Sequence, residues 1–280
     1  MGVLNNKFKD VVFCKLFGSE EYKDNLLSLF NALNNTEYDN PDDLRINTIG
    51  NSVFMGMKND LSCILDSYME LFEEQSTVNP NAPVRGMLYF SRLYETYIDE
   101  NDAYRFGSKL VRLPTPRYFV LYLGKEERPD KEILRLSKAF IHPLVEADYE
   151  WTATVLNVNI GHNKALLSAC RVLKEYSQFV ECSRRHLTAV AVEFKKKYSA
   201  AGNKGVAGKS SKTADGNKSL RSNSREIQAD SKEILWYRTS EYQEAKYRAM
   251  IEAVDECIRN NILRDFLIRN KAEVVGMYLT

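Results

Sequence analysis

Three polar residues at the ends of two neighbouring apolar segments have the types and the spacing that phosphate chemistry uses. Asp60 precedes the segment LSCIL, and Glu73 and Gln75 close the segment YMELFEEQ. Because alternate side chains of a strand share a face, Glu73 and Gln75 are expected to project together. A hairpin that turns over residues 66–68 brings Asp60 back toward their level. The segment therefore predicts carboxylates that converge at a strand end.

Such a convergence predicts an oxygen-lined site for a hard divalent cation such as Mg²⁺, because this ion prefers oxygen ligands. The ion would activate a water molecule and neutralise the charge that builds on a phosphate. Acidic residues on a solvated strand face are the alternative interpretation, since the spacing alone does not require a metal ion. Features elsewhere in the chain are needed to choose between a cation site and a solvated strand face.

The elements that must position these residues alternate between helical and strand-like patterns. Apolar spacing predicts a helix over 6–33 that is interrupted near Gly18, a second helix over 84–98 and a long helix over 164–198. Strands are predicted at 52–57, 61–65, 69–76, 115–124 and 150–160. This alternation predicts an α/β fold with a mixed central sheet and helices on its faces.

Composition and charge limit the classes of protein to which the chain can belong. Its 280 residues are 44% hydrophobic, enough to bury the core of one large domain or of a domain with an appendage. The formal net charge of +1 excludes the overall basic excess of a nucleic-acid coat protein but allows local basic patches. No apolar run reaches about 18 residues, and the first residues lack the apolar core of a signal peptide. We therefore expect no membrane association and a cytoplasmic location.

The composition changes sharply between Ser199 and Lys232, where large apolar residues are scarce and Gly, Ser, Asn and Lys are frequent. Such a segment cannot pack a core, so we expect a flexible basic linker there. A flexible arm that touches nucleic-acid backbone through its positive charge is the alternative. The change divides the chain into a domain over 1–198, a linker over 199–232 and a helical C-terminal region over 233–280.

The cysteine and histidine residues do not show the spacing of common metal sites. The five cysteines form an odd set without a C-x-x-C pair, which argues against a disulfide framework or a structural zinc site. We expect them to be buried and reduced. His142, His162 and His186 are scattered. We interpret none of them as part of an H-E-x-x-H motif or as near a cysteine at ligand spacing, so we expect structural or surface roles for them.

The order of a helix, a D-x(12)-E-x-Q pattern and a helix rich in Arg and Tyr resembles the PD-(D/E)XK nuclease superfamily. More closely, the chain is similar to the bacterial branch of recombination-promoting nucleases, the Rpn or YhgA-like transposase family. The resemblance covers nearly all of the chain except 199–232. The matching stretches are KDVVFCKLFGSEEYKDNLLSLFNAL, MGMKNDLSCILDSYMELFEEQSTVNPNAPVRGMLYFSRLYETYI, KLVRLPTPRYFVLYLG, EWTATVLNVNIGHNKALLSACRVLKEYSQFV and DECIRNNILRDFLIRNKAEVV.

This resemblance implies a restriction-endonuclease-like core and a Mg²⁺-dependent DNA endonuclease activity. Asp60 and Glu73 match the two acidic positions of the motif and would ligate Mg²⁺, or Mn²⁺ in its place. Gln75 occupies the position where the superfamily usually has lysine, and an amide there supplies hydrogen bonds but no charge. Asp10 matches an additional acid of the first helix, although a surface pairing with Lys15 would explain it equally well. These four acidic and amide residues form the expected catalytic set.

Arg85, Tyr89 and Arg92 are spaced i, i+4 and i+7, so they share one face of the helix predicted over 84–98. Arginine forms bidentate contacts with phosphates, which makes Arg85 and Arg92 candidates for binding the DNA backbone. Packing of the tyrosine ring over the arginine stems is the alternative, and the sequence favours neither.

The sequence therefore predicts a metal-dependent DNA endonuclease of the recombination-promoting type, with DNA as its partner and a homodimer as a reasonable assembly. The rival hypothesis is a nuclease fold that has lost its chemistry and serves as a nucleic-acid or protein interaction module. The absent lysine, the nearly neutral charge and the long insert favour the rival, whereas the retained Asp60, Glu73 and Gln75 oppose it. A structural protein of a mobile element without DNA contact is the third hypothesis.

Overall fold

The computed structural model describes residues 7–47, 61–101, 107–142, 148–204 and 239–276. Contacts between residues divide the chain into two compact units. Residues 9–178 form one, the sheet unit, and the described residues from Phe179 onward belong to the other, the helical unit. The sheet unit thus ends before the boundary that we expected at residue 198.

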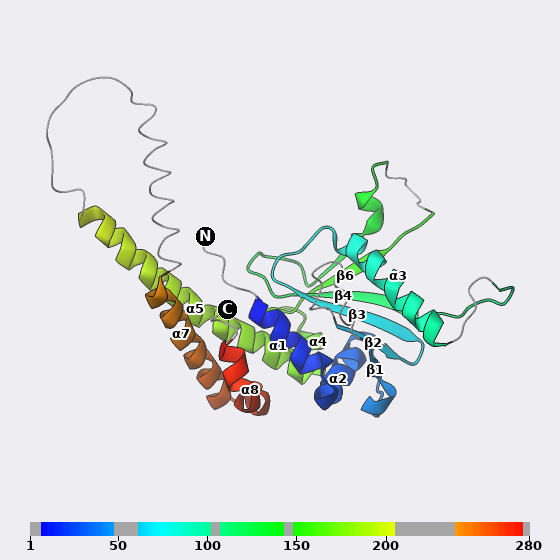
Figure 1. The fold of residues 1–280 in the computed structure, drawn as a ribbon, viewed down its shortest axis with the longest axis horizontal. Coiled ribbons are helices and arrows are strands. Elements are labelled where there is room, and N and C mark those ends of the chain that lie inside the picture. The colour runs from blue at the N-terminus through cyan, green and yellow to red at the C-terminus, as the bar shows by residue number, and fades with distance from the viewer. Residues whose placement is uncertain (1–6, 48–60, 102–106, 143–147, 205–238, 277–280) are drawn as a thin grey trace, which may run out of the picture. The chain divides into compact units, whose positions relative to one another are not determined.

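The sheet unit is built on a six-stranded mixed sheet with the strand order β1-β2-β3-β4-β6-β5 (Figure 1). Strands β3, β4 and β6 are parallel, whereas β1, β2 and β5 are antiparallel to their neighbours. The predicted α/β fold with a mixed sheet is therefore confirmed. The strands are β1 (Arg45–Ile46), β2 (Leu61–Leu65), β3 (Tyr68–Gln75), β4 (Thr115–Tyr122), β5 (Lys131–Arg135) and β6 (Thr152–Asn157).

The central strands match the prediction and the edge strands do not. Strands predicted at 61–65, 69–76, 115–124 and 150–160 are present, and the strand predicted at 52–57 lies outside the described residues. Both edge strands escaped prediction, because β1 has only 2 residues and β5, with the sequence KEILR, alternates between exposed and half-buried positions. An edge strand buries little apolar surface, so its sequence lacks the hydrophobic signal of a central strand.

Strands β2 and β3 form the predicted hairpin. Leu65 pairs with Tyr68 across a two-residue turn. Asp66 in this turn has a φ of +53°, a left-handed conformation that aspartate tolerates better than most residues. At the open end of the hairpin Leu61 pairs with Phe72, next to the acidic end of β3.

Helices cover both faces of the sheet (Figure 1). α3 (Ala82–Glu100) connects β3 to the parallel strand β4 and packs on one face, whereas α1 (Lys7–Gly18) and α2 (Lys23–Asn34) contact the other face. The predicted interruption near Gly18 is confirmed, and Ser19 caps the short 3₁₀ turn that separates the two helices. The 3₁₀ turns span Glu20–Tyr22, Pro41–Asp43 and Leu136–Ala139.

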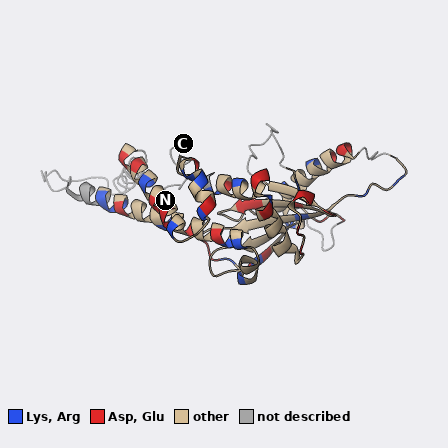
Figure 2. Cartoon of the chain, turned by 90° about the horizontal axis from the view of Figure 1, so that it is seen from below, with Lys and Arg blue, Asp and Glu red and all other residues tan. Residues whose placement is uncertain are grey.

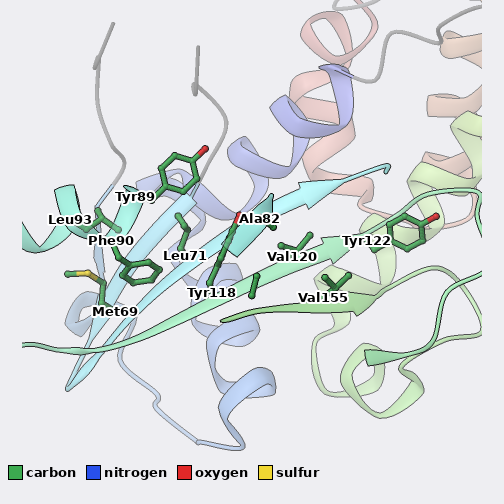
Figure 3. Packing of buried hydrophobic residues seen from close by; sticks show 11 residues of the cluster. Met69, Leu71, Ala82, Tyr89, Phe90, Leu93, Tyr118, Val120, Tyr122 and Val155 are labelled. Carbon is green, nitrogen blue, oxygen red and sulfur yellow. The ribbon is translucent and has the colours of Figure 1, made fainter. Parts of the chain in front are cut away.

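The core between the sheet and α3 determines which side chains of β3 face that helix (Figure 3). Met69 and Leu71 of β3 are fully buried there with Phe90 of α3 and Tyr118 of β4. Burial of each large apolar side chain contributes about 1.5–3 kcal/mol. Because side chains alternate along a strand, this core places the following odd-numbered residues of β3 on the α3 face.

Gly86 allows α3 to approach the sheet closely. A Cβ atom at this position would lie 2.6 Å from Trp151 Nε1 and 2.6 Å from Tyr118 Cδ1. No larger residue fits unless an aromatic ring moves. The close approach brings the part of α3 that holds Arg85 beside β4.

A helical segment follows β6 and continues past the predicted domain boundary. It consists of α4 (Lys164–Ala169) and α5 (Arg171–Lys204), so the single helix predicted over 164–198 is wrong at Cys170, where the backbone is extended. α5 extends into the range expected to be a linker, and residues 205–232 lie outside the described part of the chain.

The helical unit contains the end of α5 together with α7 (Ser240–Arg259) and α8 (Arg264–Gly276). Within the region predicted to be helical, residues 240–259 and 264–276 form helices. Phe194 of α5 packs against Tyr242 of α7 with ring centroids 5.2 Å apart. This contact explains why the end of α5 groups with the C-terminal helices and not with the sheet.

Positively and negatively charged residues are both distributed along the described elements (Figure 2). The net charge of +1 means that the two kinds are nearly equal in number in the chain. Among the described helices, none combines the length and the apolar character needed to cross a membrane.

Candidate active site

The C-terminal end of β3 carries the acidic residues on which the functional prediction depends. Glu73, Glu74 and Gln75 are consecutive there, and each has only 6% to 8% of its surface exposed. Burial removes water from a carboxylate, so each buried acid needs a charged or hydrogen-bonding partner. The two faces of the sheet supply different partners.

Two groups hold Glu73 on the α3 face. Its Oε1 lies 2.6 Å from Arg85 Nη2, and its Oε2 accepts a hydrogen bond from the Tyr118 hydroxyl. Figure 3 shows the Tyr118 ring directed toward the start of α3, where Ala82 lies. Both carboxylate oxygens of Glu73 therefore have donors.

Arg85 is held in turn by Tyr89, one helical turn further along α3. Arg85 Nη2 donates to the Tyr89 hydroxyl at 3.0 Å, and the guanidinium lies 5.7 Å from the centre of the Tyr89 ring. Burial lowers the pKa of Arg85, but Glu73 and Tyr89 outweigh it and the net pKa is raised. The guanidinium therefore stays charged, and the packing of tyrosine over an arginine stem is present together with an ion pair.

Gln75 shares the α3 face with Glu73 and leaves one donor unused. Its Oε1 accepts a hydrogen bond from the backbone N–H of Asn79 at 3.1 Å, which fastens the loop that leads into α3. Its Nε2 is buried and has no hydrogen-bond partner among the described residues. A buried donor without an acceptor costs about 1–3 kcal/mol, so an oxygen ligand that accepts from it would be favoured.

The Glu74 side chain lies on the face of β3 that α1 covers, so it belongs to a different cluster. Lys9 Nζ lies 3.3 Å from Glu74 Oε1 and also donates to Ser76 Oγ. The carboxyl group of Asp10 interacts with Glu74 as well. Burial raises the pKa of Glu74, Lys9 opposes the rise, and Asp10 adds to it. The α1 face thus brings two acids and one lysine together.

The predicted catalytic set is therefore divided between the two faces. Glu73 and Gln75 share the α3 face, as predicted, whereas Asp10 interacts with Glu74, whose side chain lies on the opposite face. Asp60 lies outside the described residues, so its convergence with Glu73 stays a prediction. Arg92 is half-buried on α3 and does not pair with Glu73.

A third buried acid, Glu70, shares the α1 face with Glu74. Its Oε1 accepts a hydrogen bond from Asn34 Nδ2 at 2.9 Å, and Arg117 Nη1 lies 3.9 Å away. Burial raises the pKa of Glu70 to about 7, because the contacts with Asn34 and Arg117 offset only part of the lost hydration. A cavity of about 460 Å³ opens beside Arg117, and neither Glu73 nor Gln75 lines it.

On the α3 face, the side chains of Glu73 and Gln75 have groups that suit a divalent cation and the oxygen ligands around it. The Glu73 carboxylate is a hard oxygen ligand, and the unused Gln75 Nε2 suits the oxygen of a water molecule or a phosphate. Arg85 holds the positive charge beside Glu73, so a cation that binds there must displace it from Oε1. Asp60 is the remaining ligand that the sequence predicts.

Three residues of these clusters were not predicted from the sequence. Tyr118 reaches Glu73 only because β4 pairs in parallel with β3, a register that leaves no mark on either segment. Lys9 and Glu74 are adjacent in the sequence to the predicted Asp10 and Glu73. A lysine on the apolar side of α1 was the available signal, because a buried lysine requires an acidic partner.

Searches against known protein families, curated proteins and solved structures found no match to this chain.

Proposed function

We propose that this chain is a metal-dependent DNA endonuclease whose site contains Asp60, Glu73 and Gln75, with Arg85 binding the substrate phosphate. The observation that carries the proposal is the shared position of Glu73 and Gln75 on one face of β3, beside the Arg85 guanidinium. The order of helix, hairpin, crossover helix and parallel strand is compatible with a restriction-endonuclease-like core. We assign α1 through β4 to such a core.

Hydrolysis of a phosphodiester bond requires an activated water molecule and neutralisation of the charge that develops on the phosphate. A bound Mg²⁺ supplies both, because it lowers the pKa of a coordinated water and polarises phosphate oxygens. Glu73 and Asp60 would hold it. The Tyr118 hydroxyl fixes the Glu73 carboxylate in one orientation before any substrate arrives.

Gln75 and Arg85 act on the substrate in this proposal. Gln75 Nε2 donates to the attacking water or to a phosphate oxygen, which gives its buried amide an acceptor that the described residues do not supply. In the protein alone, Arg85 neutralises the charge of Glu73. A metal ion bound to Glu73 would repel the Arg85 guanidinium, because two positive charges at one carboxylate repel each other. A guanidinium freed from Glu73 would be available to a phosphate oxygen, so metal binding and DNA binding would be coupled.

The test is nicking of supercoiled plasmid by the full chain in Mg²⁺ or Mn²⁺, with EDTA as the metal-free control. Asp60→Ala and Glu73→Gln should each lower the nicking rate by about a hundredfold or more. Glu95→Gln, an exposed substitution on α3, is the matched control and should leave the rate unchanged. Circular dichroism must show that each variant is folded. A wild-type protein that does not cut, or variants that cut equally well, would exclude the nuclease.

A binding module without hydrolytic activity is the second candidate, and one observation favours it. Arg85 and Tyr118 occupy both oxygens of Glu73, which is the arrangement of a structural ion pair. Fluorescence anisotropy with a labelled DNA duplex separates the two functions. Binding that needs Mg²⁺ supports the nuclease, whereas binding in EDTA that moderate salt abolishes supports the module.

A further inference from the structure

A second group of metal-ligating side chains lies in the helical unit. Cys182 and His186 are one helical turn apart on α5, and Glu256 is on α7. One donor atom from each of the three residues, a sulfur, a ring nitrogen and a carboxylate oxygen, lies within 4.8 Å of the other two. Cys182 is buried and the other two residues are half-buried, so the cluster is shielded but can be reached from solvent.

The ligand atoms of His186 and Glu256 are already oriented. His186 Nε2 lies 2.8 Å from Glu256 Oε2, while Arg185 contacts the other carboxylate oxygen, Oε1. On the opposite side of the ring, His186 Nδ1 is 3.8 Å from the Glu252 carboxylate. Histidine ligands of metal ions commonly have a carboxylate beside the second ring nitrogen, which sets the tautomer. Nε2 and Oε2 thus lie next to each other.

Cys182 supplies a sulfur atom in a polar setting. Its Sγ lies 3.6 Å from the carbonyl oxygen of Ala253 and 3.7 Å from Arg185 Nη2. Sulfur is a ligand that Zn²⁺ binds readily, in the thiolate form. Cys182 is not part of a disulfide, so this sulfur is available as a ligand.

We propose that Cys182, His186 and Glu256 bind a zinc ion that links α5 to α7, with a water molecule as the fourth ligand. One thiolate, one imidazole and one carboxylate form a donor set typical of Zn²⁺, and a tetrahedral ion needs three protein ligands and one further position. The thiol proton of Cys182 leaves when its sulfur binds the ion, so binding releases a proton to solvent. The site belongs to the helical unit and does not depend on the proposed nuclease.

Metal binding is tested on the full chain, reduced and freed of metal. Competition with a chromophoric chelator gives the Zn²⁺ affinity and should show one ion per chain. Co²⁺ in place of Zn²⁺ should give a thiolate-to-metal charge-transfer band and the intense visible bands of a tetrahedral ion. Zn²⁺ should also raise Tm, because an ion that binds only the folded state stabilises it.

Substitutions of the ligands locate the site. Cys182→Ser should abolish the charge-transfer band, and His186→Gln and Glu256→Gln should each weaken Zn²⁺ binding by at least about tenfold, since even residues that only support the ligands contribute that much. Cys170→Ser and His162→Gln are the matched controls. Cys170 is a buried thiol of the sheet unit, and His162 Nδ1 lies 2.7 Å from the Asp130 carboxylate without a cysteine nearby in the sequence.

Two results would overturn the proposal. One is a wild-type protein with no charge-transfer band, and the other is an affinity that stays unchanged in both Cys182→Ser and His186→Gln. Circular dichroism of the metal-free variants shows whether each is folded. If the buried Cys182→Ser variant is unfolded, the half-buried His186→Gln decides the test, because its side chain contributes little to the core.

Discussion

Arg85 Nη2 lies 2.6 Å from Glu73 Oε1, so the start of α3 and the end of β3 share a charge pair that is largely buried. The sequence predicts separate roles for these residues, one as a metal ligand and the other as a phosphate-binding group. Their contact makes each the counter-ion of the other in the protein alone. A ligand that binds one of these two residues must therefore also compensate for the charge left unpaired on the other.

The strength of this pair can be measured with a double-mutant cycle. Glu73→Gln, Arg85→Met and the double variant should give a coupling energy of about 3 kcal/mol in urea unfolding, because removal of one partner leaves a poorly hydrated charge. The pair between Arg45 and Glu100, 3.0 Å apart with both side chains 49% exposed, is the control. Its coupling should stay below about 1 kcal/mol. Equal coupling energies for the two pairs would contradict the assignment.

The two arginines of α3 should differ in their effect on metal binding. Arg85→Met should raise the affinity for Mn²⁺ by about tenfold, because the competing cation at Glu73 is removed. Arg92→Met should leave Mn²⁺ affinity unchanged, since Arg92 does not pair with Glu73. Both variants should weaken DNA binding. Electron paramagnetic resonance of free Mn²⁺ measures the first property, and fluorescence anisotropy measures the second. Identical Mn²⁺ titrations for the two variants would count against an exchange at Glu73.

Gln75→Glu separates the structural role of this side chain from its catalytic one. The carboxylate keeps an oxygen for the backbone N–H of Asn79, but it replaces the Nε2 donor with a second acceptor. We expect a folded protein whose plasmid nicking is about tenfold to a thousandfold slower, the range for loss of one donor to a reacting oxygen. A rate equal to that of the wild type would assign Gln75 to loop stability alone.

The hairpin and the shared face of Glu73 and Gln75 follow from the sequence, because two strand-like segments flank a short turn and alternate side chains of a strand share a face. Residues Met69 and Leu71 determine the face, and Glu73 and Gln75 follow. The partners on the other strands cannot be obtained in this way. Tyr118 meets Glu73 through the pairing of β3 with β4, which is separated from the hairpin by a whole helix.

Glu70 predicts a pH dependence of stability. The pKa of its carboxyl group is about 7 in the folded chain, against an ordinary value of 4.5, so between these pH values the unfolded chain loses a proton that the folded chain keeps. The stabilisation is fully present below pH 4.5 and is lost as the pH rises to 7, by about 3 kcal/mol in total. The free energy of unfolding in urea should therefore fall over this range.

Glu70→Gln cannot ionise and should lack this loss. As the pH rises, the wild type should lose stability that Glu70→Gln does not lose. The free energy of unfolding of the variant should therefore increase relative to that of the wild type. Glu127→Gln, an exposed substitution, is the control and should show a constant difference. A constant difference for Glu70→Gln as well would mean that Glu70 is hydrated in the folded protein.

Gly86→Ala tests the close approach of α3 to the sheet. Alanine favours the helix by about 1 kcal/mol, but its Cβ would meet Trp151 and Tyr118 at 2.6 Å. Overpacking of this kind costs about 1–3 kcal/mol, so we expect net destabilisation in urea unfolding. Ser91→Ala at an exposed position of the same helix should instead be neutral or slightly stabilising. Stabilisation by both substitutions would show that the rings move aside without cost.

The Cys182 cluster shows a different limit of sequence reasoning. Cys182 and His186 have the i, i+4 spacing of a helix face, so the interpretation that no histidine lies near a cysteine at ligand spacing is wrong for His186. The third ligand, Glu256, comes from α7. Only the packing of α7 on α5 selects one glutamate among many, and apolar contacts such as Phe194 with Tyr242 produce that packing.

The strand β5 bears on how two copies of the chain could assemble. An antiparallel self-association of this strand centred on Ile133 would place Lys131 of one copy opposite Arg135 of the other, and all three residues are exposed. Like charges directly opposite each other repel, which is how natural sheets avoid edge-to-edge aggregation. The charges of Lys131 and Arg135 therefore disfavour association of two copies through β5.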